Sequence, residues 1–153
     1  EYQSALFNRY VRKETANLSQ DAYRCLGEPY ITEHYTSKGL TGLSLEDAEK
    51  VVLTYSAKPG TSEHQTGLCV DFITESMGGN LDTGFEKTPA FSWLKENAYR
   101  FGFILRYPKE KEEITGYTYE PWHYRFVGRE AATDIYLSGV CLEEYLEVLA
   151  TVR

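Results

Sequence analysis

Apolar positions recur at helical spacing near the start of the chain. One face of a helix would carry the side chains of Tyr2, Leu6, Phe7, Tyr10 and Val11. The sequence then becomes polar from about Lys13 to Gly42 and loses this period. The pattern therefore predicts one helix at the start, followed by a long irregular segment.

A second helix is predicted to begin at Ser44, whose hydroxyl can accept a hydrogen bond from the backbone N–H of Asp47. Its apolar positions continue to Tyr55, and it should end before Pro59 because proline cannot continue a helix. The same reasoning predicts a later helix that begins at Thr88, since a capping hydroxyl is followed there by proline at the first helical position.

The remaining pattern mixes short strands with helices. The helix that begins at Thr88 should end at Gly102, and the glycine-rich residues 77–87 should form a loop. Strands are expected at residues 69–73, 103–107 and 117–127, the last interrupted by Pro121, and closing helices at 129–137 and 142–149. Because helices and strands do not alternate regularly, we predict an α+β fold with helices packed on a small, largely antiparallel sheet.

Length and charge narrow the class of protein. The 153 residues correspond to one domain, expected over 1–153. The net charge of −7 and the pI near 5.0 argue against nucleic acid or an anionic membrane as a partner. No apolar run reaches the length of a membrane helix, the first residues lack the pattern of a signal peptide, and no stable protein partner is implied. The 13 tyrosines fit either a groove for a polar polymer or half-buried sheet packing.

Three cysteines, Cys25, Cys69 and Cys141, are spread along the chain. None belongs to a Cys-x-x-Cys pair, so a zinc site built on cysteines is not expected. A bridge between Cys25 and Cys141 would suit an extracellular protein, but the sequence alone does not establish it.

Two of the three histidines lie in carboxylate-rich surroundings. His64 is followed by Asp71, and His123 is preceded by Glu120. A catalytic zinc site uses three ligands of the His, Asp or Glu type and keeps one position open for water. His64, Asp71 and His123 would meet this need, with Glu120 as the base that accepts the proton of the water. The alternative is that these are ordinary surface or core residues.

The spacing of these residues sets conditions on the chain. His64 and Asp71 are an odd number of positions apart, so on one flat strand they would point to opposite faces. The chain must therefore turn between them, and Gly67 can supply that turn. Glu120 and His123 are also separated by an odd number of positions, and a kink at Pro121 would bring both side chains to one site.

Two separated motifs resemble a known family. The stretch Pro59–Asp71, which reads PGTSEHQTGLCVD, and the stretch Glu120–Arg125, which reads EPWHYR, are similar to the VanY/LdcB group of zinc carboxypeptidases. Residues 101–108 also resemble the segment between these motifs. The resemblance implies the hedgehog/DD-peptidase fold, with one zinc ion in a cleft, and the removal of the C-terminal D-alanine from peptidoglycan stem peptides.

The resemblance also implies roles for individual residues. The zinc ligands would be His64, Asp71 and His123, Glu120 would be the catalytic base, and the hydroxyl of Ser62 would contact the substrate.

Relatives also carry a Ser-x-Tyr-Arg element followed shortly by a substrate-binding glutamine. Gln3 would be that glutamine, so the arginine would lie before Glu1, outside this chain. That arginine is expected to bind the terminal carboxylate of the substrate with two hydrogen bonds. Arg106 is the substitute within the chain, and its alternative is a structural ion pair.

Two other functions stay open at this point. The ligands and the base do not separate DD-cleavage from an LD-carboxypeptidase acting on tetrapeptides. A cell-wall binding module that retains zinc without activity is the alternative from another class, although it would have no need of Glu120. Since the implied substrate lies outside the membrane, we expect an extracellular or cell-surface bacterial protein, secreted or tethered through an upstream segment.

Overall fold

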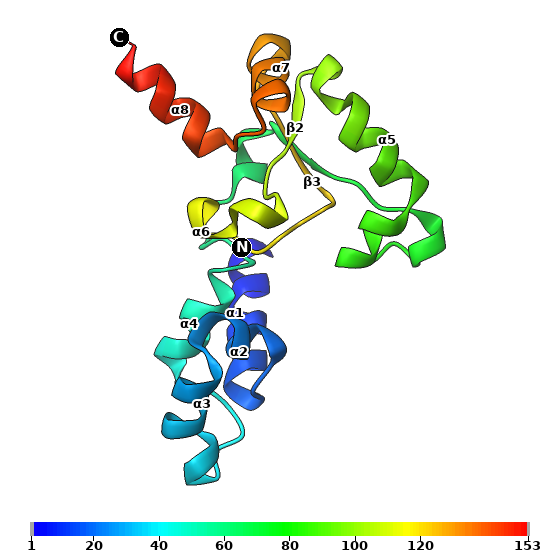
Figure 1. Ribbon diagram of the computed structural model, residues 1–153. Helices are drawn as coiled ribbons and strands as arrows, with labels where there is room; N and C mark the ends of the chain where they lie inside the picture. Colours follow the sequence, from blue (N-terminus) through cyan, green and yellow to red (C-terminus); the bar gives the residue numbers. More distant parts are fainter. Residues whose placement is uncertain (1, 153) are drawn as a thin grey trace. The chain divides into compact units, whose positions relative to one another are not determined.

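The computed structural model describes residues 2–152, and Glu1 and Arg153 lie outside the described part. The chain groups into two compact units, one ending at Ser62 and the other beginning at Glu63 (Figure 1). The expectation of a single domain over 1–153 stays a prediction beside this division. Among residues 2–152, no helix combines the length and the apolar character needed to cross a membrane.

The first unit is helical. Its helices are α1 (Tyr2–Ala16), α2 (Gln20–Leu26), α3 (Glu28–His34) and α4 (Leu45–Val52), with a short 3-10 turn at Thr36–Lys38. Its core is built from buried apolar side chains of α1, α3 and α4, among them Phe7, Val11, Ile31, Val51 and Val52. The predicted first helix is confirmed, although the side chain of Tyr2 lies outside the described part.

The predicted irregular segment from Lys13 to Gly42 is wrong, because it contains α2 and α3. Local signals start α2: Ser19 Oγ accepts a hydrogen bond of 3.0 Å from the backbone N–H of Ala22. Each of these short helices buries one apolar residue, Ala22 in α2 and Ile31 in α3. One buried residue gives no apolar period, which is why the sequence pattern missed both helices.

The helix start at Ser44 is confirmed, since Ser44 Oγ accepts a hydrogen bond of 3.2 Å from the backbone N–H of Asp47. The helix ends at Val52 and not at Tyr55. Beyond Val52 the chain forms tight turns, in which the N–H of Tyr55 bonds to the carbonyl of Val52 over 3.1 Å.

The second unit contains the sheet. Strands β1 (Cys69–Asp71), β2 (Phe103–Leu105) and β3 (His123–Phe126) pair antiparallel in the order β1-β3-β2. The prediction of an α+β fold with a small antiparallel sheet flanked by helices is thereby confirmed. The third strand is shorter than predicted, since residues 117–122 form no strand. Pro121 lacks an N–H for the ladder, so regular pairing begins only at His123.

Helices α5 (Pro89–Asn97), α6 (Glu112–Thr115), α7 (Arg129–Ser138) and α8 (Leu142–Thr151) complete this unit. Thr88 Oγ1 accepts a hydrogen bond of 3.2 Å from the N–H of Phe91, which confirms the predicted cap. After α5 a 3-10 turn ends at Gly102, where φ is +86°. A Cβ there would lie 2.6 Å from the ring of Phe126, so only glycine fits.

Two apolar clusters support the sheet from different helices. Phe91 and Leu94 of α5 pack with Tyr124 of β3, whereas Ala132 and Ile135 of α7 pack with Ile104 of β2. Residues 77–87, predicted as a loop, contain a 3-10 turn at Thr83–Lys87 that buries Phe85 in the first of these clusters. Helix α6 was not predicted, because it is a single turn without an apolar face.

All three cysteines are free thiols in the structure. Cys141 is buried and caps the start of α8, where its backbone N–H donates to Glu144 over 2.8 Å. The bridge between Cys25 and Cys141 that the sequence left open is therefore not formed here.

Candidate metal centre

Strand register and one glycine turn bring the predicted ligands together. Asp71 of β1 lies directly opposite His123 of β3, so their side chains share one face of the sheet. His64 lies before β1, in a 3-10 turn at Glu63–Thr66. Gly67 closes that turn with φ +70° and donates its N–H to the carbonyl of His64 over 3.1 Å. The expected turn at Gly67 is confirmed. It lets the side chains of His64 and Asp71 meet although they are an odd number of positions apart.

The ligand atoms of His64, Asp71 and His123 all lie within 4.8 Å of one another. Asp71 bridges the two rings: one of its oxygens is 3.4 Å from His64 Nε2 and the other is 3.2 Å from His123 Nδ1. The side chain of His123 is 7% exposed and that of His64 is 43% exposed. The trio is therefore anchored on a buried side and open on the other, as a metal site that admits water requires.

Glu120 lies beside the trio in a buried position. Its Oε2 is 3.5 Å from His123 Nδ1. The backbone turns at Pro121, since the N–H of His123 donates to the carbonyl of Glu120 over 3.2 Å, and this turn places both side chains at one site. Burial raises the pKa of Glu120 to about 7, with Asp71 and Glu63 adding to the rise and His123 opposing it. A carboxyl group with a pKa near neutrality is suited to exchange protons as a general base.

His123 carries the balancing positive charge. Burial alone would lower its pKa, but the neighbouring carboxylates of Asp71, Glu63 and Glu120 raise the pKa of His123 to about 9. The ring thus holds a proton among three carboxylates at neutral pH. A dication that binds the ring must displace that proton, because only the neutral imidazole is a ligand.

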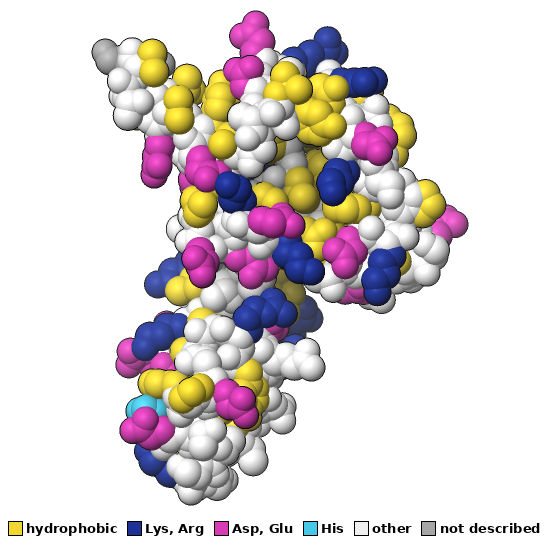
Figure 2. Space-filling view, viewed as in Figure 1, with side chains coloured by type: hydrophobic (Ala, Val, Ile, Leu, Met, Phe, Trp, Pro, Cys, Tyr) yellow, Lys and Arg dark blue, Asp and Glu magenta, His cyan; other side chains and the backbone are white. Residues whose placement is uncertain are grey.

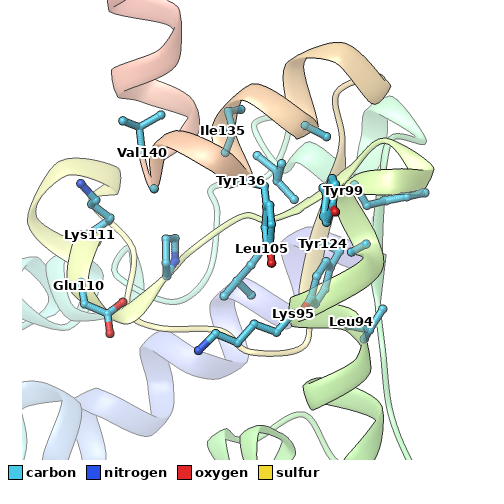
Figure 3. A pocket seen from close by; sticks show the side chains of 16 residues that line it. Leu94, Lys95, Tyr99, Leu105, Glu110, Lys111, Tyr124, Ile135, Tyr136 and Val140 are labelled. Carbon is cyan, nitrogen blue, oxygen red and sulfur yellow. The ribbon is translucent and has the colours of Figure 1, made fainter.

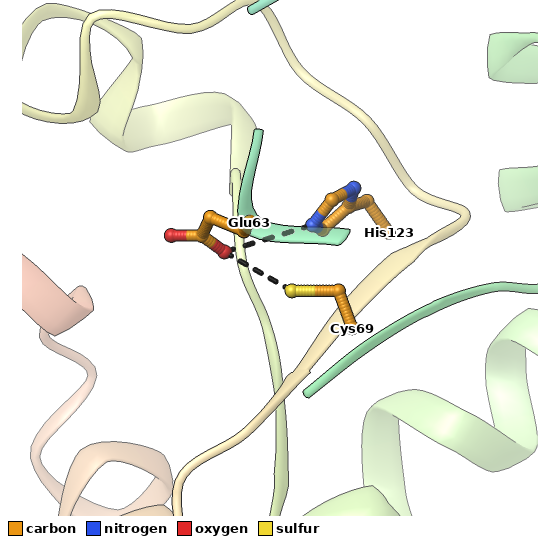
Figure 4. A group of neighbouring side chains, drawn as sticks. All are labelled: Glu63, Cys69 and His123. Atoms are coloured by element: carbon orange, nitrogen blue, oxygen red, sulfur yellow. Dashed lines mark hydrogen bonds and ion pairs between the residues drawn. The ribbon is translucent and has the colours of Figure 1, made fainter. Parts of the chain in front are cut away.

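A second trio, formed by Glu63, Cys69 and His123, also brings potential ligand atoms together (Figure 4). Two arginines already neutralise its carboxylate: Arg106 Nε donates to Glu63 Oε1 over 2.8 Å, and Arg125 Nη1 lies 3.3 Å from Glu63 Oε2. Burial and the neighbouring Glu63 raise the pKa of Cys69 to about 12, whereas a metal binds the thiolate. Two guanidinium groups and a protonated thiol make this trio the poorer site for a cation.

Arg106 is fully engaged with carboxylates. Besides Glu63, it binds Glu143 with two hydrogen bonds of 3.0 and 2.6 Å from its terminal nitrogens. This matches the structural ion pair that the sequence offered as the alternative for Arg106.

The other substrate-binding candidates, Ser62 and Gln3, belong to the first unit. Gln3 Oε1 accepts a hydrogen bond of 3.4 Å from the N–H of Gly60. The roles of Ser62, Gln3 and Arg106 toward a substrate stay predictions.

Sequence reasoning missed the carboxylate network behind the trio. Glu63 stands inside the first motif, but its partners His123, Arg106 and Arg125 lie far from it in the sequence. The signal that could have found it is its place directly before a metal-type histidine, together with the alternation that puts Arg125 on the same strand face as His123.

A cavity of about 380 Å³ lies elsewhere in the second unit. Its lining includes side chains of α5, of the 3-10 turn that follows it, and of β2, β3 and α7, namely Leu94, Tyr99, Leu105, Tyr124, Ile135 and Tyr136 (Figure 3). In the space-filling view, hydrophobic side chains floor a hollow between these helices (Figure 2). Tyr124 follows His123 on β3 and points to the opposite face of the sheet, so this cavity is separate from the candidate metal centre.

Comparison with known proteins gives a consistent group of matches. A family model described as VanY, D-alanyl-D-alanine carboxypeptidase, matches residues 1–129. The chain is 39% identical over 159 residues to YodJ of Bacillus subtilis strain 168, covering 95% of this chain and 57% of that protein. It is 54% identical over 112 residues to a D-alanyl-D-alanine carboxypeptidase of Enterococcus faecalis, covering 73% of this chain and 38% of that protein. The chain therefore spans well under two thirds of the length of these relatives.

Solved structures match as well. A D,D-pentapeptidase VanY from a VanB-type vancomycin resistance cassette, in complex with Zn(II), superposes with a TM-score of 0.64 at 42% identity, covering 94% of this chain and 64% of that one. The LdcB LD-carboxypeptidase superposes with a TM-score of 0.61 at 37% identity, covering 84% of this chain and 67% of that one. One of these proteins is a D,D-peptidase and the other an LD-carboxypeptidase.

Proposed function

We propose that this chain, which belongs to the VanY family of D-alanyl-D-alanine carboxypeptidases, is a zinc-dependent peptidase that removes the C-terminal D-alanine of peptidoglycan stem peptides. The observation that carries the proposal is the meeting of His64, Asp71 and His123 within 4.8 Å, with the carboxylate of Glu120 3.5 Å from His123. The Zn(II) complex of the VanY relative supports the choice of metal.

The donor set of this chain fits zinc. Two imidazole nitrogens and one carboxylate form a ligand set typical of catalytic zinc, which keeps a further position for water. The buried His123 and the exposed His64 leave the group accessible from one side. Asp71 faces both rings, so its carboxylate would hold the metal between the two histidines.

The reaction would be direct hydrolysis of the last peptide bond. Bound zinc would polarise the scissile carbonyl and lower the pKa of the attacking water. Glu120 would take a proton from that water as its oxygen bonds to the carbonyl carbon, and would then give the proton to the departing amine of D-alanine. A base with a pKa near neutrality can perform both transfers, and the raised pKa of Glu120 matches this double role.

LD-cleavage is the second candidate. The 37% identity to LdcB, an LD-carboxypeptidase, favours it. The metal centre and the base would serve both reactions equally. The two activities would differ in the peptide that is accepted: a stem ending in D-Ala-D-Ala for the DD-activity, and a stem with a single D-alanine for the LD-activity. A zinc-holding wall-binding module without activity is the third reading, and the buried base argues against it.

The proposed substrate sets the proposed location. Peptidoglycan stem peptides lie outside the bacterial membrane, so we propose that the protein acts at the cell surface or in the extracellular space. Fractionation of the producing cells tests this, and a protein found only in the cytoplasmic fraction would contradict it.

Digestion followed by mass spectrometry tests the activity. The zinc-loaded chain is offered a stem peptide ending in D-Ala-D-Ala and, separately, a stem peptide with a single D-alanine. Loss of one D-alanine from the first peptide supports the proposal, and loss from the second supports the LD-alternative. Glu120→Gln serves as the matched control, because it should bind zinc and leave both peptides intact.

If neither peptide shortens while one zinc is bound per chain, the test is repeated with a version that begins further upstream and includes the arginine expected before Glu1. Activity in that version alone would assign the terminal carboxylate of the substrate to the arginine. Failure of both versions would contradict the peptidase proposal.

A further inference from the structure

Glu63 is the centre of a buried network in the second unit. Its Oε1 accepts the hydrogen bond from Arg106, and its Oε2 accepts a hydrogen bond of 3.2 Å from Cys69 Sγ. Arg125 lies 3.3 Å from the same Oε2. Three side chains from different parts of the chain thus fix the position of one carboxylate.

This fixed carboxylate faces the buried side of His123 (Figure 4). His123 Nε2 is buried and has no hydrogen-bond partner among the described residues. Glu63 Oε2 lies 3.8 Å from that nitrogen, which is too long for a hydrogen bond but within reach of a small rotation of the ring. On the other side of the ring, Nδ1 faces Asp71 at 3.2 Å and Glu120 at 3.5 Å.

The two nitrogens of a metal-binding imidazole have different tasks. One presents its lone pair to the metal, and the other keeps its proton, which a carboxylate or carbonyl commonly accepts. Such a partner fixes the tautomer, holds the ring plane and makes the ligand nitrogen more basic. In this chain Nδ1 points at the candidate metal centre, so Nε2 is the nitrogen that needs an acceptor.

We propose that Glu63 is a positioning residue for the metal centre: its carboxylate accepts the Nε2 proton of His123 and so keeps Nδ1 free to bind the metal. This inference rests on the metal site of the proposed function and extends it to a residue behind the ligands. Glu63 suits the role because its carboxylate is fixed in place: Arg106 donates to Oε1 over 2.8 Å, and Arg125 lies 3.3 Å from the Oε2 that faces His123.

The chain offers a matched pair of variants. Glu63→Gln removes the charge that faces His123 and weakens the pairing with Arg106. Glu143→Gln also weakens the pairing with Arg106, but the contacts of Glu143 lie on that arginine and not on the histidine. Comparing the two separates an effect on the ligand from a loss of structural support.

The decisive readout is zinc affinity, measured by competition with a chelator at constant pH. Glu63→Gln is expected to weaken zinc binding about 10- to 100-fold, the effect typical of losing an outer partner of a metal ligand. Glu143→Gln is expected to leave the affinity near that of the unaltered protein. Equal losses in both variants, or no loss in Glu63→Gln, would overturn the proposal.

A second readout begins with the unaltered protein. Long-range ¹H–¹⁵N correlation spectra of the zinc-loaded protein show which ring nitrogen carries the proton. The proposal predicts that His123 is protonated at Nε2 and that Glu63→Ala speeds the exchange of this proton with water. A proton on Nδ1 of His123 would overturn the proposal, even if the variants fail to fold.

These measurements are independent of turnover. If no peptide is cleaved but Glu63→Gln loses zinc affinity, the proposed activity fails and the positioning role stands. If peptides are cleaved and Glu63→Gln binds zinc normally, the positioning role fails alone.

Discussion

Each of the two units buries a carboxylate, and the surroundings shift the pKa of the two carboxylates in opposite directions. In the first unit, Asp47 of α4 accepts hydrogen bonds from the hydroxyls of Tyr30 and Tyr35 and from Lys50. Burial would raise the pKa of Asp47, but these donors outweigh burial and lower it. In the second unit, Glu120 faces the carboxylates of Asp71 and Glu63, and its pKa is raised to about 7.

The difference separates a structural carboxylate, Asp47, from Glu120, the carboxylate that we propose as the catalytic base. Donors match the charge of Asp47, so it stabilises the fold without further help. Around His123, the carboxylates of Glu63, Asp71 and Glu120 lie within 3.2 to 3.8 Å of the imidazole. Arginines pair with Glu63, whereas Glu120 lies beside the carboxylate of Asp71 and has a strongly raised pKa. A buried carboxyl with a strongly shifted pKa is typical of functional sites.

The largest effect is expected from removing the charge of Glu120. Glu120→Gln should lower turnover of the cleaved peptide by about 10²- to 10⁴-fold, because the amide cannot accept the proton of water. Zinc should still bind, since the predicted ligands are unchanged. Single-turnover rates with zinc bound check this, and a variant with the rate of the unaltered protein would remove Glu120 from the reaction.

Zinc affinity should depend strongly on pH. The pKa of His123 is raised to about 9, so below that pH the metal must displace a proton. The apparent affinity should therefore rise about tenfold per pH unit toward pH 9, and binding near neutrality should release a proton. Calorimetry in buffers of different ionisation enthalpy measures that proton. Binding that is independent of pH between 6 and 9 would contradict the assignment of His123 as a ligand.

Without metal, the buried carboxyl group of Glu120 should destabilise the folded protein. The pKa of Glu120 is about 7 in the folded protein and near 4.5 as a free side chain, so folding favours its protonated form. The cost is absent below the free value, grows as the pH rises through this interval, and is complete above pH 7. Glu120→Gln should therefore raise the free energy of unfolding by ~1–3 kcal/mol at pH 8 and by little at pH 4. Urea titrations without zinc test this, and a destabilised variant at pH 8 would refute it.

The matched change in the first unit should have the opposite sign. Asp47→Asn should lower the free energy of unfolding by about 1–2 kcal/mol, because an amide is a weaker acceptor for two tyrosine hydroxyls and a lysine. Its pKa is lowered in the fold, so the stabilising effect of Asp47 is present at neutral pH and is lost as the pH falls through the carboxyl range. Zinc stoichiometry should be unchanged. A loss of zinc binding in this variant would contradict the purely structural role of Asp47.

Features set by neighbours in sequence could be predicted, and features set by distant residues could not. The caps at Ser44 and Thr88 were predicted because the hydroxyl and the amide it caps are three residues apart. Helices α2 and α3 were missed because each buries a single apolar residue. The trio of His64, Asp71 and His123 was named from motif spacing, and the strand register then explains how the trio converges.

The contacts of Glu63 could not be predicted, because its partners come from β1, from β3 and from Arg106, which directly follows β2. Arg106 and Glu143 are 37 positions apart in the chain, and only the packed structure shows that they share one ion pair. The same long range explains why Arg106, isolated in sequence, offered two readings of equal standing.

The proposed activity depends on which of the two trios holds the metal. Anomalous diffraction at the zinc edge from crystals grown with one equivalent of zinc tests this directly. We predict one strong peak within bonding distance of His64 Nε2, Asp71 and His123 Nδ1. A peak between Glu63, Cys69 and His123 Nε2, or no peak at either trio, would contradict the assignment of His64, Asp71 and His123 as ligands.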